Sequence, residues 1–297
     1  MSGTLSSAGA ACQGGSEVFS SAVNLRSIAP NLEYEPSGYW SAPAQEVVSY
    51  PTAGNDFCFG VEERSFWFAH RNAAIVAAFR RWPPQSGAVL DVGAGNGFVA
   101  AALAAAGFPV VPVEPNPAGA ANAVRRGLQH VVRGSLASAG FRAGSVAGIG
   151  LFDVLEHVPD ESSFLAEARR CLMAGGRMYL TVPAYDVLWS AEDETGGHYR
   201  RYSKRQLRRT LEAAGFTAEY VTGLFWWLPL PIALLRALPY RLGARRQDSP
   251  RAAEHTLGGR ALRTLATGSV RFEVSCVRRG WSFPFGGSLL AVARVDG

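Results

Sequence analysis

The chain has 297 residues, of which 48% are hydrophobic, so it is long enough to bury one full α/β core and to carry additional segments. Its net charge of +5 comes almost entirely from arginine, because Lys204 is the only lysine. The four cysteines are widely separated and form no C-x-x-C pair, which argues against a zinc site or a disulfide framework and favours a reducing, cytoplasmic setting. Residues 1–21 are small and polar and do not have the pattern of a secretory signal.

Strands and helices are expected to alternate along most of the chain. In chain order, the hydrophobic patterns predict a helix over 71–81, a strand over 89–92, a helix over 98–106, a strand over 110–114, a helix over 118–126, strands over 129–133 and 146–152, a helix over 161–172, a strand over 178–182, a helix over 204–214 and a strand over 217–222. Such alternation implies a doubly wound α/β fold with a parallel sheet, in which ligands bind at the carboxyl ends of the strands.

The strand over 89–92 is followed by a turn with glycine at alternate positions, Gly93, Gly95 and Gly97. Glycine permits positive φ and leaves room for a ligand, and the next helix begins with unpaired N–H groups, so a nucleotide-like ligand is expected. In the dinucleotide fingerprint G-x-G-x-x-G the third glycine would fall at position 98, which is Phe98. The spacing therefore argues against an NAD(P)-dependent oxidoreductase.

Asp91 followed by G-x-G-x-G resembles motif I of the class I S-adenosylmethionine-dependent methyltransferases. Glu114 ends the next apolar run, where a carboxylate of this family receives the ribose hydroxyls. The stretch 149–158, with Asp-Val-Leu-Glu-His at its centre, is similar to the end of the fourth strand in small-molecule methyltransferases, and 175–183 and 286–293 resemble the fifth and the last strands. The resemblance covers 62–222 and the last strand. It implies a Rossmann-like sheet of seven strands, the last antiparallel, with S-adenosylmethionine as cofactor and S-adenosylhomocysteine as product.

The resemblance also implies which residues bind the cofactor. They are Asp91, Gly93, Ala94, Gly95, Gly97, Glu114, Pro115, Ser135, Phe152, Asp153 and Arg71. The family commonly has an acidic residue for the adenine amino group after the third strand, whereas this chain has Gly134-Ser135-Leu136, so Ser135 or backbone atoms would take that place. Arg71 follows Phe66-Trp67-Phe68, a segment similar to one in a bacterial branch of these enzymes. Its charge suits the cofactor carboxylate, and a surface ion pair is the alternative.

His198 and His157 are the candidates for removing a proton from the acceptor. His198 is preferred because the family places substrate-facing residues in the loop after the fifth strand, while His157 has the alternative of pairing structurally with Glu156 or Asp153. Substrate contacts are expected from Tyr199, Tyr202, Trp67 and Trp226. The D-x-x-E-H arrangement of Asp153, Glu156 and His157 is similar to the E-x-x-E-H metal motif of some quinone-pathway O-methyltransferases. Relatives without metal share it, so no metal is expected.

An apolar segment over 224–235 precedes an arginine-rich one over 236–251. It is too short, and too interrupted by proline, to span a membrane, and it is expected to cap an apolar substrate pocket or to contact a membrane surface peripherally. The arginines reflect either a compositional bias or an anionic partner. No nucleic-acid-binding module is apparent, so a small-molecule substrate is expected and nucleic acid is not.

The chain is accordingly divided into a partly disordered N-terminal extension over 1–55, a cofactor-binding core over 56–222, an insert over 223–285 and the last core strand over 286–297. The expected function is methyl transfer to a small apolar or aromatic acceptor, with oxygen favoured over nitrogen or carbon, in secondary metabolism or in lipid or quinone biosynthesis. Two alternatives stay open: an NAD(P)-dependent oxidoreductase, and a non-catalytic membrane-surface protein that keeps the methyltransferase fold.

Overall fold

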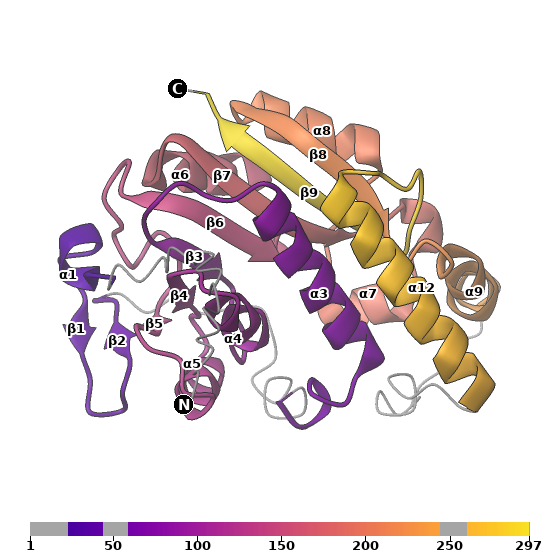
Figure 1. Ribbon diagram of the computed structural model, residues 1–297, viewed down its shortest axis with the longest axis horizontal. Coiled ribbons are helices and arrows are strands. Elements are labelled where there is room, and N and C mark those ends of the chain that lie inside the picture. The colour runs from indigo at the N-terminus through magenta and orange to yellow at the C-terminus, as the bar shows by residue number, and fades with distance from the viewer. Residues whose placement is uncertain (1–22, 44–58, 244–259, 297) are drawn as a thin grey trace, which may run out of the picture.

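The computed structural model describes residues 23–43, 59–243 and 260–296. One sheet runs through this part of the chain, with the strand order β1-β2-β5-β4-β3-β6-β7-β9-β8 (Figure 1). Its strands are β1 (Glu33–Tyr34), β2 (Trp40–Ser41), β3 (Val89–Val92), β4 (Val110–Val113), β5 (Val132–Arg133), β6 (Val146–Phe152), β7 (Leu172–Pro183), β8 (Phe216–Leu224) and β9 (Ser288–Val295).

The central strands are parallel, and the last strand is antiparallel to its neighbours. β3 pairs in parallel with β4 and β6, β4 with β5, and β6 with β7. β9 lies between β7 and β8 and is antiparallel to both. The expected doubly wound Rossmann-like sheet with an antiparallel last strand is therefore confirmed.

Two short strands from the N-terminal extension lengthen the sheet from the expected seven strands to nine. β1 and β2 pair antiparallel, and β2 then pairs in parallel with β5 through Trp40 and Val132. Tyr39 anchors this hairpin because it is buried against Ala120 and Val131. The described part of the extension thus covers the edge of β5. The part of the extension expected to be disordered, residues 1–21, lies outside the described residues.

Helices cover both faces of the sheet. They are α1 (Leu25–Ile28), α3 (Phe66–Arg81), α4 (Phe98–Ala105), α5 (Pro117–Arg125), α6 (Glu161–Cys171), α7 (Ala191–Gly196), α8 (Lys204–Ala213), α9 (Pro229–Ile232), α10 (Leu238–Arg241) and α12 (Arg260–Arg279), with the short helical turns η1 (Leu155–His157), η2 (Asp186–Leu188) and η3 (Ala233–Ala237). Buried side chains of α3, α4 and α12 share one hydrophobic cluster, and those of α1, α6 and α8 share another.

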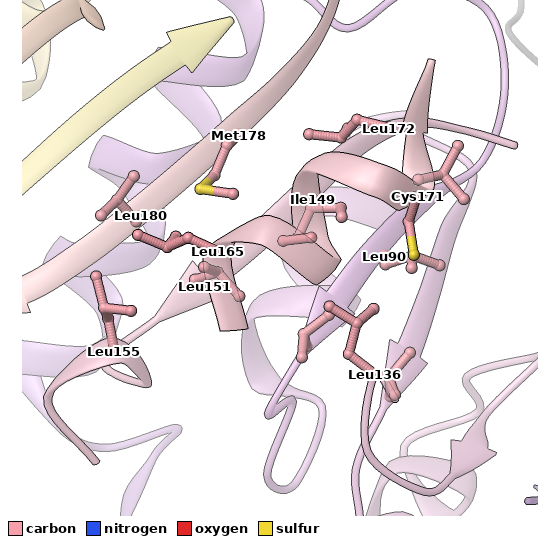
Figure 2. Packing of buried hydrophobic residues seen from close by; sticks show 14 of the residues in the cluster. Leu90, Leu136, Ile149, Leu151, Leu155, Leu165, Cys171, Leu172, Met178 and Leu180 are labelled. Atoms are coloured by element: carbon pink, nitrogen blue, oxygen red, sulfur yellow. The ribbon is translucent and has the colours of Figure 1, made fainter. Parts of the chain in front are cut away.

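Alternation along the strands divides the core between these two layers. Val89 belongs to the cluster under α3, and the next residue, Leu90, to the cluster under α6. Figure 2 shows the second layer, in which Leu165 of α6 lies against Ile149 and Leu151 of β6 and Leu180 of β7. A parallel sheet must be apolar on both faces for this packing, which is why its strands are recognisable as continuous apolar runs.

Most predicted elements begin and end within two residues of the observed ones, and three have a boundary that differs by more than two residues. α3 begins at Phe66 rather than at 71, because Phe66 and Trp67 pack on the α3 cluster. β5 contains only Val132 and Arg133, since His130 has a positive φ of 57° that interrupts the extended run. β7 begins at Leu172 rather than at 178, before a shift in its register with β6.

The insert before the last strand contributes a layer of the core. α12 packs along α3, as Figure 1 shows, and Val274 and Val277 are buried there. The Glu273 carboxylate, also on α12, bonds to His70 of α3 and accepts the N–H groups of Phe225 at 3.0 Å and Trp226 at 3.1 Å. None of the described helices is long and apolar enough to cross a membrane.

Candidate active site

A cavity of about 410 Å³ opens at the carboxyl ends of β3, β4 and β6. This is the edge at which a doubly wound sheet binds its ligands. The residues around the cavity are Glu62, Phe68, Arg71, Asp91, Val92, Gly93, Ala94, Gly95, Asn96, Phe98, Val99, Glu114, Pro115, Gly134, Ser135, Leu136, Phe152, Asp153, Val154, His157, Val158 and Phe164. Ten of the predicted cofactor residues are among them, and Gly97 is not.

The three glycines of the turn have different physical roles. All have positive φ, at 70° for Gly93, 54° for Gly95 and 74° for Gly97. A Cβ on Gly93 would approach Val154 to 2.7 Å, and a Cβ on Gly97 would approach Leu128 to 2.4 Å, so these two glycines permit close packing. A Cβ on Gly95 would meet nothing within 4 Å, because this glycine faces the cavity. Gly95 is thus the position at which a ligand can lie against the backbone.

The carboxylate of Glu114 is fixed at the rim of this turn. It follows β4, is 6% exposed, and accepts the N–H groups of Gly95 and Asn116, each at 2.7 Å. Burial raises the pKa of Glu114, and these two hydrogen bonds oppose the rise. Each carboxylate oxygen accepts more than one hydrogen bond, so both can still receive donors from a ligand.

Asp91 lies below the turn, at the end of β3. It is 2% exposed, and one of its oxygens has no hydrogen-bond partner among the described residues. Burial and the nearby Glu114 raise the pKa of Asp91 to about 7, against the opposing charge of Arg71. Such an incompletely satisfied carboxyl group beside a cavity is the typical complement of a cationic ligand group.

This raised pKa predicts that Asp91→Asn stabilises the cofactor-free protein at alkaline pH. The folded-state pKa lies above the ordinary value of 3.8, so the stability contribution of Asp91 is complete below about pH 4 and is lost as the pH rises through about 7. Asparagine does not ionise. We expect a gain of roughly 1–4 kcal/mol in the free energy of unfolding near pH 8 and none near pH 4, measured by urea denaturation.

The same comparison near pH 4 provides the control for this measurement, because the folded parent and the folded variant then both carry a neutral side chain at position 91. An Asp91→Asn protein that is less stable than the parent at alkaline pH would contradict the burial of an uncompensated charge.

Arg71 and Asp153 form an ion pair at the wall of the cavity. Asp153 follows β6 with a positive φ of 57° and also accepts the Thr181 hydroxyl at 2.8 Å. The Arg71 side chain is 11% exposed and that of Asp153 is 30% exposed, so the ion-pair alternative considered for Arg71 is realised, in a partly buried form. Phe68 lies one helical turn before Arg71 and also lines the cavity.

Ser135 lies at the other end of the cavity and is held in a local turn by Ser138. The Ser135 hydroxyl accepts the Ser138 N–H at 3.0 Å, and the Ser138 hydroxyl accepts the Ser135 N–H at 2.8 Å. The adjacent Gly134 lies under the N-terminal hairpin, since a Cβ there would approach Ala42 to 2.8 Å. The extension and the loop after β5 therefore shape this end together.

The two candidate histidines lie in contact. His157 is in η1 at the cavity wall, and the His198 ring packs against it with centroids 4.8 Å apart, just outside the cavity lining. Burial and the neighbouring His198 lower the pKa of His157, which favours its neutral form.

Asp193 positions His198 and was not anticipated from the sequence. Its carboxylate is fully buried and lies 2.8 Å from Nδ1 of His198. It also accepts a bidentate pair of hydrogen bonds from Arg201, at 2.7 and 2.9 Å. Although burial alone raises the pKa of Asp193, the hydrogen bonds from His198 and Arg201 hold it below the ordinary value. An ionised Asp193 fixes the His198 proton on Nδ1, which leaves Nε2 as the acceptor in the neutral ring.

Several predicted substrate contacts lie elsewhere. Tyr202 is buried in the core, with its hydroxyl 2.6 Å from Glu161 of α6, so the expectation that it faces the substrate was wrong. Trp67 stacks on Phe225. It is adjacent in sequence to the cavity-lining Phe68, so its side chain is rotated about 100° around the helix axis away from the cavity. Tyr199 and Trp226 are exposed and do not line the cavity.

Asp153 of the D-x-x-E-H arrangement pairs with Arg71, and it is not in the group of potential metal ligands found among the described residues. The structure instead brings ligand atoms of Glu156, His157 and His198 within 4.8 Å of one another. Burial, and next the charge of Asp153, raise the pKa of Glu156 well above its ordinary value, which favours a neutral carboxylic acid.

A buried polar network supports the turn and was also missed. Asn96 accepts an amide hydrogen bond from Asn122 at 2.9 Å and donates one to Glu62 at 3.0 Å, and Glu62 pairs with Arg126. These contacts tie α5 and the segment before α3 to the glycine turn. The only sequence signal for them is an amide inside the glycine run.

Residues 62–221, more than half of the chain, match the family model described as a methyltransferase domain. With a Rossmann-like sheet and a glycine-turn cavity at its carboxyl edge, this match defines a class I S-adenosylmethionine-dependent methyltransferase. The chain belongs to the methyltransferase domain family.

Three relatives are similar over part of their length. A "Probable S-adenosylmethionine-dependent methyltransferase" of Mycolicibacterium smegmatis is 27% identical over 59% of this chain and 68% of its own. An "Uncharacterized methyltransferase" of Mycobacterium sp. strain JLS is 40% identical over 44% of this chain, which spans about half (51%) of that relative. The "Ubiquinone biosynthesis O-methyltransferase" of Xanthomonas axonopodis pv. citri is 27% identical over 49% of this chain and 69% of its own.

A solved structure from Thermotoga maritima shares the fold. It is named "SAM-dependent methyltransferase, possible histamine N-methyltransferase", and it aligns with 82% of this chain and 95% of its own at a TM-score of 0.50 and 16% identity. The family match and the similar relatives show that the chain is a methyltransferase enzyme. They do not support the two alternatives that the sequence left open, an oxidoreductase and a non-catalytic protein.

Proposed function

We propose that this methyltransferase transfers a methyl group to a hydroxyl oxygen of a small apolar or aromatic acceptor, with His198 removing the hydroxyl proton. The observation that carries the proposal is the buried Asp193 carboxylate behind His198, which leaves Nε2 free to accept a proton beside the cavity. A phenolic hydroxyl has a pKa near 10 and is a poor nucleophile until its proton is removed. The similarity to an O-methyltransferase of ubiquinone biosynthesis supports the same acceptor atom.

The cavity suits S-adenosylmethionine by both size and charge. Its volume of about 410 Å³ lies in the range of small-molecule sites. Glu114 would receive the ribose hydroxyls, Gly95 would let the ligand approach the backbone, and Ser135 would lie toward the adenine. The α-amino acid end of the cofactor carries both charges, for which Asp91 and Arg71 are the matching groups.

S-adenosylmethionine supplies a methyl group that its sulfonium already activates. The chain therefore has three tasks: to hold the acceptor oxygen in line with that methyl group, to exclude water and to remove one proton. Phe68, Phe152 and Val158 give the cavity apolar walls. His198 accepts the proton at Nε2, and Asp193 stabilises the resulting imidazolium.

A panel of acceptors tests this proposal. We expect the purified protein to release S-adenosylhomocysteine with phenols or catechols that carry apolar substituents, and a deuterated methyl donor to place the label on oxygen by NMR. Matched anilines and the corresponding O-methylated phenols serve as controls for the acceptor atom. Labelling of nitrogen or carbon alone would overturn the O-methylation proposal and leave the methyltransferase assignment unaffected.

A further inference from the structure

A stripe of exposed leucines follows one side of the helical segment after β8. This segment runs from Pro229 to Arg241 as α9, η3 and α10. The exposed leucines are Leu230, Leu234, Leu235, Leu238 and Leu242, each between 48% and 76% exposed. Leu230, Leu234, Leu238 and Leu242 recur every four residues and Leu235 is adjacent to Leu234, which places all five on one side of a helix. We define these five residues as the leucine stripe, and nothing within the described part of the chain covers it.

The opposite side of the same segment is fixed to α7, the helix that carries Asp193. The Tyr240 hydroxyl bonds to Glu194 of α7, and Arg236 approaches Glu192 at 3.8 Å. Ile232 and Ala237 are buried against the body of the protein. The leucine stripe is therefore the outer face of a docked helix, and its orientation is set by the contacts of the inner face.

Basic and aromatic residues accompany the stripe. Arg236 and the exposed Arg241 lie within the segment, and the sequence continues with Arg245 and Arg246. Trp226, 39% exposed, lies three residues before α9 and stacks toward Phe283. Leucines on one side, arginines at the flanks and a tryptophan at the entrance are the composition of helices that lie in a lipid–water interface.

We propose that the leucine stripe docks the protein on an anionic membrane surface. The leucines enter the acyl boundary, and the exposed Arg241 contacts the lipid phosphates. A second copy of the chain fits this surface less well, because both copies carry a net charge of +5, whereas an anionic lipid surface has the complementary charge. Docking does not depend on the proposed acceptor. If the acceptor is apolar, docking also brings α7, which carries Asp193, close to the membrane in which such a molecule dissolves, a consequence that rests on the proposed function.

Vesicle co-sedimentation of the full chain tests this inference. We expect the parent protein to sediment with vesicles of phosphatidylcholine containing about a third phosphatidylglycerol, and far less with phosphatidylcholine alone or in concentrated salt. Leu234→Ser with Leu235→Ser should lower the bound fraction at limiting lipid by about tenfold, without any change in charge. Arg241→Gln should produce a smaller loss on anionic vesicles.

Tyr34→Ser is the matched control, because Tyr34 is equally exposed, at 60%, on β1 at the opposite edge of the sheet. It should bind vesicles as the parent does, and all variants should bind S-adenosylhomocysteine alike, which shows that they are folded. Equal sedimentation of the parent and the double leucine variant would overturn the inference, as would no sedimentation of the parent. A third outcome is that the parent forms a dimer, the double leucine variant is a monomer, and neither binds vesicles. That outcome would assign the stripe to a contact between copies of the chain.

Discussion

Replacing Gly95 with aspartate is expected to abolish cofactor binding while the protein stays folded. The added side chain would enter the cavity, where nothing else lies within 4 Å of its Cβ, and its charge would lie close to Glu114, whose carboxylate already accepts the Gly95 N–H. The backbone φ of 54° is one that aspartate tolerates better than most residues. Calorimetry with S-adenosylhomocysteine should show an affinity lower by about 100-fold or more.

Gly127→Asp separates the loss of binding from the strain of a positive φ. Gly127 has a φ of 82°, also has nothing within 4 Å of a Cβ, and lies outside the cavity lining. This variant should bind S-adenosylhomocysteine as the parent does. Normal binding by Gly95→Asp would show that the ligand does not lie against this turn.

Replacing His198 with asparagine is expected to lower kcat for a hydroxyl acceptor by about 10²- to 10⁴-fold, the usual contribution of a general base. Affinity for S-adenosylhomocysteine should change little, because His198 packs behind His157 and does not line the cofactor cavity. The rate is measured with the acceptor found in the panel described above, and the affinity by calorimetry.

His157→Asn is the comparison that assigns the role of each histidine. His157 lines the cavity and has its pKa lowered by burial, whereas the ring of His198 is held by the buried Asp193 carboxylate. We expect a smaller loss of kcat from this variant, together with some loss of affinity. The reverse ranking of the two variants would make His157 the base and His198 its support.

The sheet and the grouping of residues around the cavity at its carboxyl edge could be predicted from sequence, because local patterns determine both. Strands buried on both faces are continuous apolar runs, and parallel topology then brings the residues that follow them, such as Asp91, Glu114 and Asp153, to one edge. The positions of these carboxylates follow from strand order alone, and no side-chain detail was needed to group them.

The acceptor side could not be predicted in the same way, because it depends on how loops fold back. Tyr199 and Tyr202 are three residues apart, yet a β-bridge between Tyr202 and Ala184 turns one ring into the core while the other stays at the surface. Asp193 reaches His198 only because Gly197 ends α7 in a left-handed conformation. The sequence does contain Ser190-x-x-Asp193, a capping-box pattern, which predicts the start of α7 but not the contact with His198.

The position of β9 has a consequence for the order in which the molecule can fold. β9 follows every other described strand in sequence, yet it is inserted between β7 and β8, which do not pair with each other. While the chain is being synthesised, β7 and β8 therefore have open edges until β9 leaves the ribosome. Unpaired strand edges can pair with other chains, so we expect the nascent protein to depend on chaperones more than its completed sheet would indicate.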